Sequence, residues 1–332
     1  MYPQDYSYIS CFLLGLYCWL PVSQERTKTK INVSRSGQRI TNRGGCKLSE
    51  QPEEKLTGGN VNEVVRVGDT VRRGSDPSIN ANRYVHELLS HLEKEGFHQA
   101  PKYLGMDEKG REILSYLDGD VPGNDYPEIE SYMWSDESLI SVAHLLRAYH
   151  DATVNFTTVE QPVNLYPGIG RDEHSHKSVD TNSENSEVVC HNDFALYNIV
   201  FRQGLPQGII DFDLACPGPR MWDIAYTLYT CVPLANFSPK LEEQGKSVAS
   251  YDREMHANVR KKRIELFMKA YGSHVPPDLK DWVVSRIRFM CKTLEDRALA
   301  GDLAFVKMVE EGHLAHYERE VIFLEQHWQE WT

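Results

Sequence analysis

VVCHNDFALYNIVFRQGLPQGIIDFDLA, residues 188–215, decides the fold of this 332-residue chain. Three short apolar runs in it predict β-strands, and the last two are residues 199–201 and 208–210. Gly204 and Pro206 lie between these two runs and predict a turn, so the two strands form a hairpin. Polar residues follow the strands directly, which puts the reactive side chains of the segment on a rigid frame.

Three of these polar residues fit one kind of chemistry. If the turn is centred between residues 204 and 205, Asn198 lies directly across from Asp211 at the open end of the hairpin. A carboxylate and an amide oxygen held side by side suit Mg²⁺, which prefers oxygen ligands. Asp193 lies on the loop that enters the hairpin and can face the same space. We expect Asn198 and Asp211 to bind the metal and Asp193 to be the general base of phosphoryl transfer, in preference to a role in capping strands alone.

Residues His191 to Asn198 resemble the catalytic loop of the aminoglycoside phosphotransferase family. Ile210-Asp211-Phe212-Asp213 is similar to the metal-binding strand end of that family. Asp223, within Pro217-Gly218-Pro219-Arg220-Met221-Trp222-Asp223-Ile224-Ala225, resembles an aspartate that opens a helix and braces the catalytic loop. The resemblance extends over about residues 57–330 and also includes Leu146-Arg147-Ala148-Tyr149-His150, which precedes the catalytic loop.

The resemblance implies a protein-kinase-like two-lobed α+β fold, with a small antiparallel sheet in the N-lobe and a mainly helical C-lobe. We expect a disordered or loosely packed N-terminal extension at residues 1–55 and a nucleotide-binding N-lobe at residues 56–120. The C-lobe, with the catalytic loop and the acceptor site, takes residues 121–332.

The apolar patterns agree with this division. In the N-lobe they predict strands at Val61–Val67 and Thr70–Arg73 around Gly68-Asp69, a helix at Ile79–Glu95, and strands at Pro101–Leu104 and Glu112–Leu117. In the C-lobe they predict a helix capped by Ser135 and helices at Met255–Tyr271, Leu279–Ala300 and Asp302–Trp328. The polar stretch 168–187 predicts a loop, whose His174-x-His176 pair is expected to be solvated rather than to bind a metal.

The resemblance also implies ATP and Mg²⁺ as cofactors. Gly59 and Asn60 belong to the loop expected over the phosphates. Ser115 to Leu117 would form the linker whose backbone meets the adenine, so Ser115 and Leu117 are candidate nucleotide contacts. His191 is expected to tie the catalytic loop to neighbouring backbone, a structural role.

Two features depart from the family pattern. Arg73 stands where the family has a phosphate-binding lysine, and a guanidinium binds phosphate with a different geometry from an ammonium. In the family, the glutamate that pairs with this lysine lies on the following helix. When that helix is aligned with this sequence, Val85 takes the position of the glutamate. Glu87, two positions away, is then a candidate partner of Arg73. Asn192 and Asp213 replace glycines, and Asp213 is expected to face solvent rather than the metal.

The distribution of charge and the spacing of the cysteines indicate which ligands and which cellular compartment suit this protein. The net charge of −12 arises entirely after residue 120, because residues 1–120 carry equal numbers of acidic and basic side chains. This distribution argues against a nucleic-acid partner and would suit a cationic small molecule. Seven dispersed cysteines predict reduced thiols and a cytoplasmic protein. The apolar run Ile9–Leu20 is too short to span a membrane, which needs about 20 residues.

These observations predict a small-molecule kinase that transfers the γ-phosphate of ATP to a hydroxyl of an aminoglycoside-like, choline-like or other amino metabolite. The alternative is a weakly active or inactive kinase-fold protein that serves as a nucleotide-binding or regulatory module. The acceptor, the choice between ATP and GTP and the oligomeric state stay open at this stage, because the fold and the phosphate-binding groups do not determine them.

Overall fold

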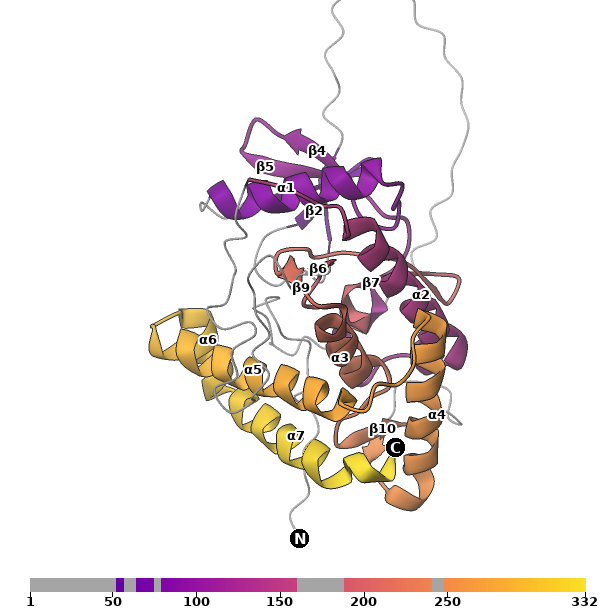
Figure 1. Ribbon diagram of the computed structural model, residues 1–332. Coiled ribbons are helices and arrows are strands. Elements are labelled where there is room, and N and C mark those ends of the chain that lie inside the picture. The colour runs from indigo at the N-terminus through magenta and orange to yellow at the C-terminus, as the bar shows by residue number, and fades with distance from the viewer. Residues whose placement is uncertain (1–51, 57–63, 75–78, 160–187, 241–247) are drawn as a thin grey trace, which may run out of the picture.

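The computed structural model describes residues 52–56, 64–74, 79–159, 188–240 and 248–332. Figure 1 shows a small sheet with one helix at one end of the molecule and a larger, mainly helical part at the other. The predicted α+β class, with an antiparallel sheet in the N-terminal part and helices in the C-terminal part, is confirmed. The predicted strand Val61–Val67 is described only from Val64 onward.

The N-terminal sheet has five antiparallel strands. In spatial order they are β1 (Glu54–Lys55), β2 (Val64–Val67), β3 (Thr70–Gly74), β5 (Arg111–Ser115) and β4 (Tyr103–Met106). Gly68, with φ of 61°, allows the tight turn that joins β2 to β3. β1 lies within the range predicted as an extension, yet it pairs with β2. Helix α1 (Ile79–Lys94) buries the apolar stripe Tyr84, Val85, Leu88, Leu89 and Leu92.

Helices dominate the C-terminal part. They are α2 (Asp136–Thr153), α3 (Arg220–Cys231), α4 (Arg253–Tyr271), α5 (Leu279–Leu299), α6 (Leu303–Glu310) and α7 (His313–His327), with short 3₁₀ turns at η1 (Pro122–Asp125), η2 (Ser131–Trp134), η3 (Leu196–Asn198) and η4 (Trp328–Glu330). The side chain of Ser135 accepts a hydrogen bond from the Ser138 N–H and caps α2 as predicted. Among the described residues, none of the helices combines the length and the apolar character that crossing a bilayer would require.

The single helix predicted at Asp302–Trp328 is two helices. Gly312 lies between α6 and α7 with φ of 88°, a left-handed conformation that a right-handed helix cannot contain. The apolar pattern of the sequence continues across Gly312, so periodicity alone predicts one helix instead of two.

Two small antiparallel strand pairs flank the loop that contains Asp193. β6 (Val188–Cys190) pairs with β9 (Cys216–Gly218), and β7 (Ile199–Arg202) pairs with β8 (Leu205–Ile209). A further pair, β10 (Phe237–Pro239) with β11 (Val248–Ser250), lies near the C-terminal helices. The chain thus uses short strands to position a loop rather than to build a second large sheet.

The predicted register of the β7–β8 hairpin is wrong by one residue. The turn is centred between Gln203 and Gly204, and a bulge between Val200 and Phe201 shifts the pairing again. As a result the backbone of Asn198 faces Ile210, whose N–H donates to the Asn198 carbonyl oxygen at 2.9 Å. Asp211 follows immediately, so it still lies at the open end of the hairpin.

Backbone contacts join the two parts of the molecule at two places. Asp120 and Phe201 exchange N–H···O hydrogen bonds of 2.9 and 2.7 Å, and the Ile209 N–H donates to the Gln99 carbonyl oxygen at 2.8 Å. Gly119, just before the first contact, has φ of 151°, and a Cβ atom there would lie 2.5 Å from the Phe201 carbonyl oxygen. Only glycine fits at this position.

Gly119→Ala should therefore destabilise the protein by about 1–3 kcal/mol more than Gly105→Ala, because overpacking adds to the backbone strain. Gly105 is a matched control: its φ is also positive, at 118°, but nothing lies within 4 Å of a Cβ atom added there. Chemical denaturation followed by circular dichroism measures both free energies of unfolding. Equal losses would contradict the role assigned to the Gly119 contact.

Candidate active site

Asp193 lies in the loop between β6 and η3, and it is almost fully buried. The Tyr197 hydroxyl donates a hydrogen bond of 2.5 Å to Oδ1, and Nδ2 of Asn198 donates one of 2.8 Å to Oδ2. Burial, with a smaller effect of the nearby Asp211 charge, raises the pKa of Asp193 to about 7. A carboxylate with its pKa near neutrality can accept a proton from a hydroxyl and release it again, which suits a general base.

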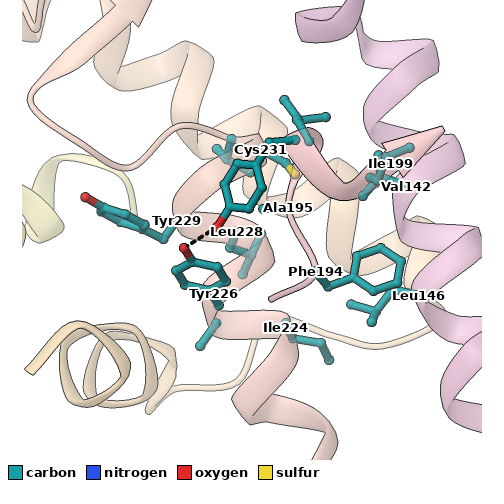
Figure 2. Close-up of a cluster of buried hydrophobic side chains, with 14 of the residues drawn as sticks. Val142, Leu146, Phe194, Ala195, Ile199, Ile224, Tyr226, Leu228, Tyr229 and Cys231 are labelled. Carbon is teal, nitrogen blue, oxygen red and sulfur yellow. Dashed lines mark hydrogen bonds between the residues drawn. The ribbon is translucent and has the colours of Figure 1, made fainter. Parts of the chain in front are cut away.

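The loop around Asp193 is fixed by a packed apolar core. Figure 2 shows Phe194 beside Leu146 of α2 and Ile199 beside Val142 of the same helix. Next to this core, the Tyr226 hydroxyl lies 2.7 Å from the Tyr197 hydroxyl, so Asp193 is at the end of a chain of two tyrosines. Sequence reasoning missed these tyrosines, although Tyr197 lies inside the motif itself.

Asn198 and Asp211, the predicted metal ligands, come from the two sides of the hairpin end. The Asn198 amide nitrogen donates to Asp193, which leaves Oδ1 as the atom suited to coordinate a cation. Asp211 has φ of 68°, a strained left-handed conformation that occurs often at functional sites. Burial and then the charge of Asp213 raise the pKa of Asp211, while Arg73 opposes the increase.

This donor set fits Mg²⁺ only with help from a substrate. Among the described residues there is no group of three or more histidine, cysteine, aspartate or glutamate side chains that could hold a metal ion unaided. Mg²⁺ commonly takes one or two protein oxygens and completes its coordination with phosphate and water.

Asp223, in the first turn of α3, holds the backbone of the loop that contains Asp193. Its two carboxylate oxygens accept hydrogen bonds from the backbone N–H groups of His191 and Asn192 at 2.6 and 2.8 Å. Nε2 of His150 on α2 lies 3.1 Å from Oδ2. Burial alone would raise the pKa of Asp223, but these hydrogen bonds and the nearby histidines lower it, so the buried carboxylate stays charged.

His191 ties the same loop to the neighbouring strand. Nδ1 accepts from the Asp193 N–H at 3.3 Å, and Nε2 lies 3.1 Å from the Ile210 carbonyl oxygen. Burial lowers the pKa of His191 to about 4, so the ring is neutral and Nε2 is the donor. Arg286 of α5, which the sequence did not single out, donates to the Asn192 carbonyl oxygen at 2.7 Å.

Arg73 on β3 reaches from the sheet to the end of the hairpin. It donates to Asp213 at 2.8 and 3.1 Å and to Glu112 at 2.9 and 3.1 Å, and its Nη1 lies 3.8 Å from Asp211. Burial would lower the pKa of Arg73, but the attraction of the three carboxylates outweighs it and raises the pKa. The structure thus brings the predicted phosphate-binding residue next to one predicted metal ligand.

Two expectations about Arg73 are wrong. Glu87 is not its partner, because the Glu87 carboxylate accepts from the Thr158 hydroxyl and lies 3.6 Å from Arg83. Asp213 does not simply face solvent, because it pairs with Arg73. Helical geometry explains the first error, since a residue two positions from the expected one faces about 200° away from it.

The other residues predicted to contact the nucleotide are Ser115, Leu117, Gly59 and Asn60. Ser115 is the last residue of β5, and its N–H donates within the sheet to the Lys102 carbonyl oxygen at 2.9 Å. The Leu117 side chain reaches Gly208 of β8, where a Cβ atom would lie 3.0 Å from Leu117 Cδ1. Gly59 and Asn60, like the His174-x-His176 pair, lie outside the described residues.

Comparison with known proteins supports the sequence motif. Residues 173–253 match the model of the phosphotransferase enzyme family. A trifolitoxin immunity protein of Rhizobium leguminosarum bv. trifolii is 35% identical over 164 residues, which are 49% of this chain. The chain covers 55% of the length of that relative, so the match leaves much of both proteins unaligned.

Solved structures extend the likeness to the fold. The GDP complex of aminoglycoside 2′-phosphotransferase-IIIa has a TM-score of 0.52 and 18% identity, over 83% of this chain and 94% of the other. The streptomycin–ATP complex of APH(2″)-IIa has a TM-score of 0.51 and 14% identity, over 84% of this chain and 95% of the other. The resemblance to the aminoglycoside phosphotransferase family is confirmed, in sequence over residues 173–253 and in fold over more than four fifths of the chain.

Proposed function

We propose that this chain is an ATP-dependent phosphotransferase that moves the γ-phosphate of ATP to a hydroxyl of a small molecule. The observation that carries the proposal is the arrangement of Asp193, Asn198 and Asp211 near one end of the β7–β8 hairpin, with Nη1 of Arg73 3.8 Å from Asp211. A general base, two oxygen ligands for a cation and a phosphate-binding guanidinium are the groups that phosphoryl transfer needs.

Asp193 is proposed to orient the acceptor hydroxyl and accept its proton. The hydroxyl oxygen attacks the γ-phosphorus, the bond from that phosphorus to the bridging oxygen breaks, and ADP leaves with the bridging oxygen. Tyr197 and Asn198 each occupy one site on the Asp193 carboxylate. Each carboxylate oxygen has a second lone pair, so the hydrogen bonds fix the orientation of the base without preventing it from accepting a proton.

Arg73 is proposed to bind the transferred or leaving phosphates. The rest of the nucleotide is proposed to contact Ser115, Leu117, Gly59 and Asn60. Asn198 and Asp211 would hold Mg²⁺, which supplies charge neutralisation at the phosphates. The proposed roles of His191 and Asp223 are structural: one ties the loop to Ile210, and the other fixes the backbone N–H groups of the loop.

The acceptor is proposed to be a cationic amino compound, such as an aminoglycoside or a choline-like amine. The acidic balance of residues 121–332, 32 acidic against 20 basic side chains, supports a cationic ligand. The relative named as an immunity protein adds toxins to the acceptors to be screened. We also propose a cytoplasmic location, where ATP is available and where the free thiols of Cys190, Cys216, Cys231 and Cys291 stay reduced.

A second candidate function is nucleotide binding without rapid transfer. The contacts of Arg73 with Asp213 and Asp211 favour it, because these two carboxylates compete with phosphate for the guanidinium. Catalysis and simple binding differ in one measurable respect, which is the consumption of ATP when an acceptor is present.

A metal-dependent ATP-consumption screen against aminoglycosides, choline-like amines, sugars and toxins tests the proposed activity. We expect turnover with one acceptor class, and Asp193→Asn should lower that turnover by about 10²–10⁴-fold while it leaves ATP binding intact. ATP binding without turnover across the whole panel would favour the binding function. Undiminished turnover of the Asp193→Asn variant would remove Asp193 from the mechanism.

Asp211→Ala should abolish the tightening of ATP binding that Mg²⁺ produces, because the variant lacks the charged ligand of the proposed metal site. Isothermal titration of ATP with and without Mg²⁺ measures the effect. Glu128→Gln is the control, since Glu128 is an exposed carboxylate. Tightening that persists in Asp211→Ala would rule out this residue as a ligand.

Arg73→Ala should weaken ATP binding by about 10-fold or more, in line with the loss of a charge-assisted contact to phosphate, and Arg72→Ala should have a smaller effect. The two residues are adjacent on β3, but Arg72 bonds to the Thr70 hydroxyl and lies 3.9 Å from Asp107, away from the hairpin. Fluorescence titration with a labelled nucleotide gives both dissociation constants. The opposite order of effects would assign the phosphate contact to Arg72.

A further inference from the structure

The guanidinium of Arg73 has two edges with different surroundings. Nε and Nη2 donate to Oε2 of Glu112, whereas Nη1 and Nη2 donate to the two oxygens of Asp213. The Glu112 side chain is 1% exposed and the Asp213 side chain is 38% exposed. One edge of the Arg73 guanidinium therefore contacts a buried carboxylate, and the other edge contacts a partly exposed carboxylate.

The Arg73–Glu112 contact is fixed by the sheet. Arg73 and Glu112 are directly opposite each other on the neighbouring strands β3 and β5. Side chains in this relation point to the same face and stay within contact distance as long as the strands remain paired. The contact needs no particular position of α1, the helix on which the family places the partner of its phosphate-binding lysine.

Helix α1 nevertheless contributes to the cluster through His86. Nε2 of His86 lies 2.7 Å from Oε1 of Glu112, the oxygen that Arg73 does not use, and the imidazole stacks on Tyr103 with ring centroids 3.7 Å apart. Burial opposes ionisation of Glu112, but the hydrogen bond from His86 and the charge of Arg73 lower its pKa. Both carboxylate oxygens thus have partners, as a buried charge requires.

We infer that Glu112 is the positioning residue of Arg73: its buried carboxylate holds one edge of the guanidinium, and the edge now paired with Asp213 binds the nucleotide phosphate. The inference rests on the proposed function, in which Arg73 contacts phosphate. In this arrangement Asp213 competes with phosphate for Arg73, whereas Glu112 stays in place when a nucleotide binds. The strand β5 takes over the task that a helix glutamate has in the family.

Titration of Mg²⁺–ATP into the full-length protein, without acceptor, tests the inference. Glu112→Gln should raise the dissociation constant by about 10-fold or more, as is typical when a group that orients a ligand-binding residue is lost. Asp213→Asn should lower the dissociation constant, because it removes the competing charge. Glu87→Gln, the matched control on α1, should leave it unchanged, since Glu87 contacts Thr158 and Arg83 instead.

A double-mutant cycle separates positioning from a general effect on the fold. If Glu112 acts through Arg73, Glu112→Gln should cause no further loss of affinity in an Arg73→Ala background. Additive losses, wild-type affinity of Glu112→Gln, or weaker binding by Asp213→Asn would each overturn the inference. If Glu112→Gln does not fold, Glu112→Asp keeps the charge and can replace it in the cycle, with a smaller loss expected.

The outcome also distinguishes this inference from the proposed function. Wild-type affinity of Arg73→Ala for ATP would refute the phosphate-binding role of Arg73 and, with it, this inference. A loss of affinity in Arg73→Ala with none in Glu112→Gln would refute only the positioning role of Glu112.

Discussion

The buried carboxylate of Asp223 is the constraint on which the candidate site depends. A loop that turns between two strands exposes backbone N–H groups, and inside a protein these groups need an acceptor. Asp223 supplies both of its oxygens to the N–H groups of His191 and Asn192, and His150 faces the same carboxylate. The charge is stable there because the hydrogen bonds to it outweigh the cost of burial. Asn192, one of the two residues held in this way, has a positive φ of 65°.

A second electrostatic cluster connects the sheet to the hairpin. Arg73 contacts Glu112 and Asp213 and lies 3.8 Å from Asp211, so one guanidinium faces three carboxylates. In the proposed function, the negative charge at the hairpin end would attract a divalent cation and the guanidinium would attract phosphate. A metal–nucleotide complex satisfies both requirements together, which gives a physical reason for the two to bind as a unit.

The sequence predicted the features that depend on local pattern. Strand and helix positions follow from apolar periodicity, and the grouping of Asp193, Asn198 and Asp211 follows from their distance along a single hairpin. The features it missed depend on a single residue conformation or on contacts between distant segments. A bulge after Val200 changed the register, and Gly312 divided a continuous apolar pattern into two helices.

Partner choice was the least predictable aspect of the site. The sequence pattern suggested Glu87 as the partner of Arg73. The observed partner, Glu112, is 39 residues away in the chain but lies on the neighbouring strand of the sheet. The number of residues between two strands does not reveal which side chains face each other, because that depends on strand order. Here β5 lies beside β3, and β4 takes the edge.

The backbone contacts between the two parts of the molecule restrict how these parts can move relative to each other. Gln99 and Asp120 are both anchored to the β7–β8 hairpin, on Ile209 and Phe201. A hinge motion that separates the two parts would break these hydrogen bonds, so the contacts couple residues 99 and 120 to the β7–β8 hairpin. Arg73 lies on β3, the central strand of the sheet, and stays opposite Glu112 of β5 in any motion that keeps the sheet intact. Any movement of Arg73 relative to Asp211 and Asp213 would therefore involve the whole sheet, with Gln99 and Asp120 as its points of attachment to the hairpin.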